Sequence, residues 1–149
     1  MARGSHDIGK KGEQLTWGFL ERKGYKKPTK VEKVKIHEYY FSKGINIEGG
    51  YDVIKINDIP KIGKSDICLY EVKTTGEKRG LYINENFKKF GFTLTEKEKR
   101  NADTLKNMYR FIFCNLATKT YKIYSLNDFF IKQKSSIYRT WSIFITKDL

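Results

Sequence analysis

Two alternating runs of apolar residues in the middle of the chain constrain its fold most strongly, because both also carry acidic residues. The first run extends from Tyr51 to Asn57 and the second from Ile67 to Thr74. Alternation with a period of two is typical of a half-buried β-strand. Pro60 and Gly63 lie between the runs, where they favour a reversal of the chain. The pattern therefore predicts an antiparallel hairpin with a long connection.

The register of this hairpin follows from matching its apolar positions. If Ile54 faces Leu69 across the pair, Asp52 stands directly opposite Glu71. Lys73 lies two positions after Glu71, so both side chains share one face of the strand. The sequence thus predicts two carboxylates and one ammonium group in a single cluster.

This cluster has the composition of a divalent-cation site. Mg²⁺ prefers oxygen ligands and usually keeps several waters, so two carboxylates from Asp52 and Glu71 suit it, with the main-chain carbonyl of Val72 as a third oxygen. Two partly buried carboxylates repel each other strongly unless a cation lies between them. Lys73 is then placed to hold or deprotonate a water and to stabilise negative charge. The predicted chemistry is Mg²⁺-dependent phosphodiester hydrolysis, with Mn²⁺ as a substitute.

A structural alternative remains open at this point. An exposed cross-strand cluster of acids and lysine is common on solvated sheets and contributes little free energy. The competing acids are Asp58, in the connection, and Asp66, which strand parity places with Cys68 and Tyr70 and away from Glu71. Both are expected to serve the turn.

The remaining patterns predict further helices and strands around the hairpin. Thr95 and Glu98 have the spacing of a capping box at the start of a helix. The predicted elements are a helix over 8–23 ended by Gly24, a short strand over 31–36 whose spacing also allows a helical turn, a short strand over 81–83, a helix over 96–107, a hairpin of 109–116 with 120–126, a short helix over 127–132 and a strand over 141–146.

The charge balance favours a polyanionic partner. Lys and Arg number 30 against 17 Asp and Glu, which gives a net charge of +13. Nucleic acid is the expected partner, and DNA the specific prediction. Candidate contacts to its phosphates are Thr74, Thr75, Lys78, Arg79, Lys88 and Lys89, with Tyr82, Phe87 and Phe90 between them for base stacking. A second basic cluster comprises Lys10, Lys11, Lys26, Lys27 and Lys30.

Several classes of protein are excluded or disfavoured by what the sequence lacks. No apolar run approaches the ~20 residues of a membrane helix, and no glycine-rich nucleotide loop supports a nucleotide cofactor. Cys68 and Cys114 lie in apolar segments and are expected to be buried reduced thiols, which suggests a cytoplasmic protein. Residues 1–6 are typical of an expression-vector scar. Residues 7–149 are expected to form one domain.

The spacing of Asp52 and Glu71-Val72-Lys73 resembles the PD-(D/E)XK, restriction-endonuclease-like superfamily of nucleases, which includes archaeal Holliday-junction resolvases. Gly50-Tyr51-Asp52-Val53, Glu71-Val72-Lys73-Thr74-Thr75 and Phe92-Thr93-Leu94-Thr95 with Glu98 and Ala102 resemble a small, mostly uncharacterised family within it. The resemblance covers about residues 8 to 126. It departs from the superfamily at Tyr51, where proline is frequent, and in the long basic stretch between Thr75 and Phe92.

The resemblance implies an α/β fold with a mixed β-sheet core in the order α-β-β-β-α-β, flanked by helices. Because superfamily members often add a glutamate from the first helix, it also implies an auxiliary role for Glu13. The resulting expectation is a DNA endonuclease, with a homodimer as the simplest way to cut both strands. Two alternatives remain: an inactive nucleic-acid-binding module of the same fold, and a regulatory or interaction protein of a mobile element.

Overall fold

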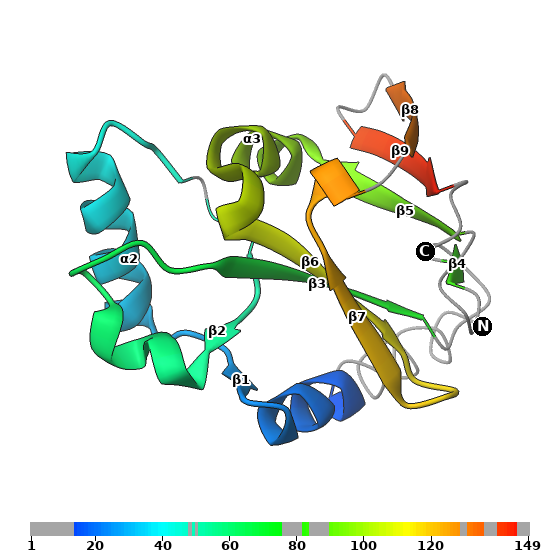
Figure 1. The fold of residues 1–149 in the computed structure, drawn as a ribbon, viewed down its shortest axis with the longest axis horizontal. Coiled ribbons are helices and arrows are strands. Elements are labelled where there is room, and N and C mark those ends of the chain that lie inside the picture. The colour runs from blue at the N-terminus through cyan, green and yellow to red at the C-terminus, as the bar shows by residue number, and fades with distance from the viewer. Residues whose placement is uncertain are drawn as a thin grey trace, which may run out of the picture.

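The computed structural model describes residues 14–47, 49, 51–75, 82–83, 90–128, 131–135 and 140–145, with side chains for 14–47, 49, 51–74 and 92–128. These residues form a mixed α/β arrangement of helices and small sheets (Figure 1). This agrees with the predicted α/β class. The strands are arranged in separate small sheets rather than in one continuous sheet.

The central sheet has the strand order β3-β6-β7. Its strands are β3 (Leu69–Thr75), β6 (Tyr109–Asn115) and β7 (Thr120–Tyr124). β6 and β7 pair antiparallel and confirm the predicted second hairpin. β3 and β6 run parallel, with Glu71 opposite Phe111, which requires the long crossover that the chain supplies between them. The predicted metal-ligand strand therefore has a neighbour on one side from much later in the chain.

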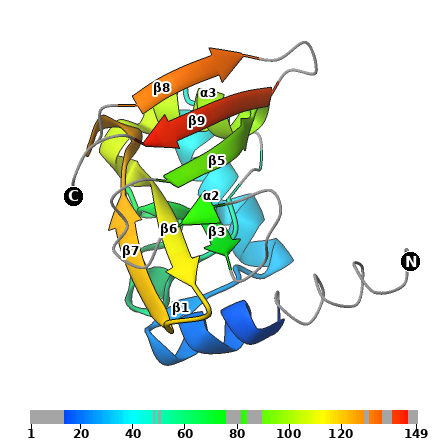
Figure 2. The same cartoon turned by 90° about the vertical axis from the view of Figure 1, so that its right-hand side faces the viewer.

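A second, antiparallel sheet has the order β4-β5-β9-β8. Its strands are β4 (Tyr82–Ile83), β5 (Phe90–Thr95), β9 (Thr140–Ile145) and β8 (Ile131–Ser135). Figure 2 shows β5, β9 and β8 side by side. The short helix predicted over 127–132 is wrong: a 3-10 turn, η3, covers only Leu126–Asp128, and β8 follows. Pairing with β9 supplies the main-chain hydrogen bonds that a helix would have made locally.

The first predicted hairpin forms only in part. Its register is confirmed at one point, because Val53 pairs antiparallel with Tyr70 as predicted. Its first strand is much shorter than predicted: β2 (Ile54–Lys55) pairs instead with β1 (Tyr25–Lys26). The chain then enters the 3-10 helix η1 (Ile56–Lys61). Pro60 lies inside η1 and has no N–H for a strand ladder, so the strand cannot resume through this residue.

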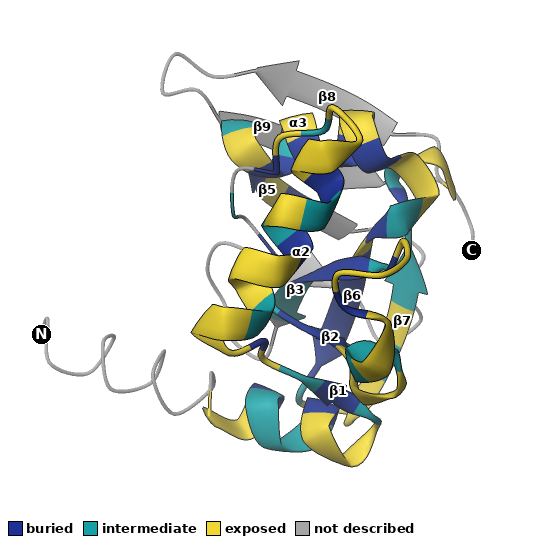
Figure 3. Ribbon diagram, turned by 90° about the vertical axis from the view of Figure 1, so that its left-hand side faces the viewer, coloured by how far each residue is buried: buried dark blue, intermediate teal, exposed yellow. Residues whose placement is uncertain are grey.

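The strand predicted over 31–36 is wrong, and the helical alternative is right. Residues Lys30–Ser42 form the helix α2, which begins with a capping box. Thr29 Oγ1 accepts a hydrogen bond from the Glu32 N–H at 3.1 Å, and Glu32 Oε1 accepts one from the Thr29 N–H at 2.8 Å. Only Ile36 and Tyr40 of this helix are buried, so its apolar period is too sparse to be read from sequence alone (Figure 3).

The other two predicted helices are confirmed where they are described. α3 (Glu96–Leu105) begins with the predicted capping box and continues into the 3-10 turn η2 (Lys106–Met108). The first helix is described over residues 14–22 and ends at Gly24, whose φ of +93° suits glycine. None of the helices in the described part of the chain has the length and apolar character needed to cross a bilayer.

Two apolar clusters cover opposite faces of the central sheet. The first includes Leu69, Tyr109, Phe111 and Phe113 with residues of α2 and β5, and the second includes Tyr70, Ile112 and Cys114 with residues of the first helix. Cys68 and Cys114 are free thiols, as predicted, although Cys68 is only partly buried. Burial raises the pKa of the Cys114 thiol to about 12. Alternate residues of β3 thus point into two separate environments.

Candidate functional site

Asp52 lies where the pairing of its segment with β3 is interrupted. The N–H groups of Asp52 and Val53 both donate to the Tyr70 carbonyl, at 2.7 and 3.1 Å, so two residues face one as in a β-bulge. In a regular antiparallel ladder the Val72 N–H would then donate to the carbonyl of Tyr51. Here it donates to Asp52 Oδ2 at 2.8 Å. A side-chain carboxylate thus replaces a main-chain acceptor and is fixed against the edge of β3.

Glu71 stands next to this carboxylate on β3 and is 8% exposed. Burial raises the pKa of the Glu71 carboxyl far above its ordinary value, and the neighbouring acids Asp52 and Glu98 raise it further. Lys73 acts in the opposite direction but does not cancel these effects. Asp52 and Glu71 are therefore brought together as predicted, in surroundings that disfavour two negative charges.

Lys73 shares the face of Glu71, as strand parity predicts. Its Nζ lies 3.8 Å from Glu71 Oε1 but only 3.0 Å from Glu98 Oε1. The Val72 side chain packs in the second apolar cluster on the other face of the sheet. The Val72 N–H points to Asp52, and the carbonyl of a strand residue leaves on the same side as its N–H, so this oxygen faces the same edge.

Glu98 is a member of this cluster for which sequence reasoning assigned no role in the site. It is 6% exposed and lies at the start of α3. Its Oε1 accepts hydrogen bonds from Lys73 Nζ and from the Thr95 N–H, both at 3.0 Å. The overlooked signal is its spacing: Glu98 lies four and seven residues before Ala102 and Leu105, both buried, and so belongs to the inward stripe of α3.

The acids of this cluster outnumber its basic group. Asp52, Glu71 and Glu98 contribute three carboxyl groups, whereas Lys73 contributes one ammonium group and lies nearer to Glu98 than to Glu71. Carboxylate and carbonyl oxygens are the ligand type that hard divalent cations accept. No group of three or more His, Cys, Asp or Glu side chains among the described residues is arranged to hold a metal ion.

α3 also fixes the segment that leads to Asp52. Asn101 Nδ2 donates to the Gly49 carbonyl at 2.5 Å. The Tyr51 hydroxyl lies 3.2 Å from His37 Nε2 on α2. Burial, followed by the nearby Glu71 and Glu98, raises the pKa of Tyr109 below the cluster, so this phenol stays neutral. Two helices and β6 together define the surroundings of the two carboxylates.

The competing acids lie elsewhere, as parity predicts. Asp66 accepts hydrogen bonds from the Tyr39 hydroxyl on α2 at 2.9 Å and from Nζ of Lys43, the C-cap residue of that helix, at 2.7 Å. These bonds, that from Lys43 first, lower the pKa of Asp66. Asp58 lies 3.6 Å from Lys61 within η1. Neither contributes to the cluster around Glu71.

The structure separates Thr74 from the carboxylates. Its hydroxyl lies 3.3 Å from the Thr16 hydroxyl of the first helix, on the face of β3 opposite to Glu71 and Lys73. Only the main chain of Thr75 is described. The remaining predicted site residues, Glu13, Lys78, Arg79, Lys88 and Lys89, lie outside the described residues.

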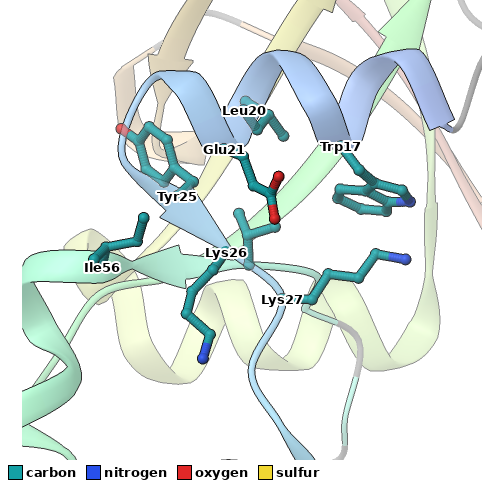
Figure 4. A pocket seen from close by; sticks show the side chains of 8 residues that line it. Trp17, Leu20, Glu21, Tyr25, Lys26, Lys27 and Ile56 are labelled. Carbon is teal, nitrogen blue, oxygen red and sulfur yellow. The ribbon is translucent and has the colours of Figure 1, made fainter.

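A pocket of about 730 Å³ lies on that same opposite face, under the first helix (Figure 4). Its wall contains Trp17 with Lys27, whose Nζ lies 4.1 Å from the centre of the indole ring. The other lining residues are Leu20, Glu21, Tyr25, Lys26, Val53 and Ile56. None of the cluster residues Asp52, Glu71, Lys73 or Glu98 lines it. The carboxylate site and this pocket are therefore separate.

Comparisons of the chain with protein-family models, with curated proteins and with solved structures each gave no match.

Proposed function

We propose that this protein is a metal-dependent endonuclease that hydrolyses phosphodiester bonds in DNA. The observation that carries the proposal is the approach of Asp52 and Glu71 at the edge of β3, with Lys73 on the same face. Such a pair of acids in buried surroundings costs free energy unless a cation compensates it. This cost favours a functional role for the two acids over a purely structural one.

The roles of the residues follow from their positions. Asp52 and Glu71 would hold Mg²⁺ or Mn²⁺ together with the Val72 carbonyl, and the ion supplies charge stabilisation and a water of lowered pKa when bound. Lys73 places an ammonium group beside Glu71, where it orients water or stabilises negative charge on the phosphate. Glu13 is proposed as an auxiliary acid on the strength of the superfamily resemblance.

DNA is proposed as the substrate because of charge. A net charge of +13 attracts a polyanion and speeds its encounter with the protein. The proposed phosphate contacts are Thr75 and the basic residues that lie between β3 and β5 in the sequence: Lys78, Arg79, Lys88 and Lys89. Thr74 is less suited to that role because its hydroxyl faces Thr16.

The test is a nicking assay on supercoiled plasmid with Mg²⁺ or Mn²⁺, compared with EDTA. We expect nicked product with either metal, and its loss in Glu71→Ala and in Lys73→Ala. Matched controls are Glu38→Ala and Lys35→Ala, which remove the same charges from the exposed face of α2. The proposal fails if no form of DNA is cut, or if cutting persists unchanged in either site variant.

A second candidate is a nucleic-acid-binding module that does not cut. It is favoured by the absence, among the residues described, of three acid, His or Cys side chains arranged around one metal. This candidate predicts DNA binding that persists in EDTA, weakens steeply with salt and is unaffected by Glu71→Ala. Fluorescence anisotropy with labelled DNA at several salt concentrations, together with the nicking assay, separates the two functions.

A further inference from the structure

We infer that Glu98 is a positioning residue that holds the Lys73 ammonium away from Glu71, so that the Asp52–Glu71 pair stays available to a divalent cation. This inference rests on the proposed function and deepens it. It assigns a role to a residue of α3 whose carboxylate bonds to Lys73 and to the Thr95 N–H.

The geometry of Lys73 carries the inference. Its Nζ lies between two carboxylates. That of Glu98 on α3 is 3.0 Å away, and that of Glu71 on β3 is 3.8 Å away. The shorter contact is a hydrogen bond, whereas the longer one exceeds hydrogen-bond length. Both carboxylates are at most about one-tenth exposed, so water screens neither interaction well. Lys73 is thus paired with Glu98 in preference to Glu71.

Without Glu98, Lys73 would keep Glu71, whose Oε1 lies 3.8 Å from its Nζ, as its carboxylate partner. A direct ammonium–carboxylate bond at Glu71 would occupy the oxygen that a cation needs and would offset the negative charge that attracts the cation. Glu98 therefore prevents a direct Lys73–Glu71 ion pair from blocking the cation site.

Glu98 does not act as a ligand in this inference. Its Oε1 already accepts two hydrogen bonds, from Lys73 and from the Thr95 N–H. It is fixed there by the capping box of α3, since Thr95 Oγ1 also accepts from the Glu98 N–H at 3.2 Å. A cap is rigid because main-chain groups hold the side chain. The capping box that begins α3 thus also fixes the carboxylate to which Lys73 binds.

The Glu98→Gln variant separates charge from capping, because glutamine also serves in a capping box. We propose to measure binding of Mn²⁺ alone, by electron paramagnetic resonance of free Mn²⁺, in the unaltered protein, Glu98→Gln, Lys73→Gln and the double variant. Glu32→Gln, in the capping box of α2, and Glu96→Gln, on the exposed side of α3, are matched controls for capping and for charge. Thermal unfolding verifies that each variant folds.

We expect Glu98→Gln to weaken Mn²⁺ binding by about 10- to 100-fold, the usual effect of losing a residue that orients a metal site. The double variant should recover most of this loss, because the competing ammonium is gone and the net charge of the cluster equals that of the unaltered protein. Both controls should bind Mn²⁺ as the unaltered protein does.

A metal-free crystal structure of Glu98→Gln gives a readout that does not depend on activity. We expect Lys73 Nζ to move into hydrogen-bond contact with Glu71. An unmoved Lys73, unaltered Mn²⁺ affinity in Glu98→Gln, or a double variant as weak as Glu98→Gln would each overturn the inference. If the unaltered protein binds Mn²⁺ with the expected variant pattern but cuts no DNA, the inference stands and the endonuclease proposal fails.

Discussion

Two capping boxes of the same form lie in the described part of the chain, and they differ in what surrounds them. Thr29 and Glu32 begin α2, and Thr95 and Glu98 begin α3. Each glutamate also pairs with a lysine, Lys26 at 2.8 Å in the first box and a β3 lysine at 3.0 Å in the second. The local chemistry of the two motifs is therefore almost identical.

Their burial is what separates them. The glutamate side chain is 17% exposed in the α2 box and 8% exposed in the α3 box. At α2 the hydrogen bond from Lys26 lowers the pKa of Glu32, so the pair behaves as an ordinary ion pair. At α3 the lysine stands beside Glu71, whose pKa is raised by burial. The same motif is thus a helix start in one place and part of a charged site in the other.

The largest expected effect on stability comes from replacing each capping-box glutamate with alanine. Glu98→Ala should lower the free energy of unfolding by about 2 kcal/mol, because it removes a cap acceptor and the main partner of a partly buried lysine. Glu32→Ala should cost about 1 kcal/mol or less, because its pair is more exposed. Urea unfolding in EDTA at pH 7 measures both, and equal losses would contradict the difference in burial.

The second prediction concerns pH and has opposite signs in the two regions. The pKa of Glu71 is raised above its ordinary 4.5, so its ionisation costs stability as pH rises above that value. Glu71→Gln should therefore stabilise the metal-free protein, by on the order of 1 to 2 kcal/mol at pH 8 and little at pH 4.5. Saturating Mg²⁺ should remove this advantage by stabilising the unaltered protein.

Glu32 provides the control for that pH dependence. Its pKa is lowered, so its contribution is present above pH 4.5 and is lost as pH falls through the lowered value. Glu32→Gln should thus show a small, constant loss between pH 5 and pH 8. Thermal unfolding in EDTA across this range tests both variants. A stability difference for Glu71→Gln that does not change with pH would show that the surroundings of Glu71 do not disfavour its ionised form.

The third prediction tests whether the two caps are locally equivalent. Thr29→Ala and Thr95→Ala each remove one side-chain acceptor for a main-chain N–H. Each should lower the free energy of unfolding by about 1 kcal/mol. Circular dichroism during urea unfolding measures the loss. A much larger loss for Thr95→Ala would mean that the α3 cap is coupled to the charged cluster rather than acting as a local helix start.

The smallest expected effect is that of salt. Raising the NaCl concentration should reduce the stability difference between the unaltered protein and Glu32→Gln by a few tenths of a kcal/mol, because Lys26 and Glu32 are partly solvated. The corresponding difference for Glu98→Gln should change less. Unfolding curves at low and high salt measure both, and an equal salt response would place the Lys73–Glu98 pair in contact with solvent.

The sequence alone determined those features that depend on local spacing. Strand parity placed Glu71 and Lys73 on one face and Val72 on the other, and the predicted register is confirmed at the Val53–Tyr70 bridge. The cap of α3 and the β6–β7 hairpin were predictable for the same reason. In each case neighbouring residues supply the interactions.

Only the tertiary structure decided what lies around those residues. The parallel pairing of β3 with β6, the short β2 and the helix α2 depend on partners far along the chain. So does Glu98, which sequence identified as a cap but which folding brings within 3.0 Å of Lys73. The physical reason is that a cap or a parity rule needs only nearby residues, whereas burial and charge compensation depend on everything packed against a side chain.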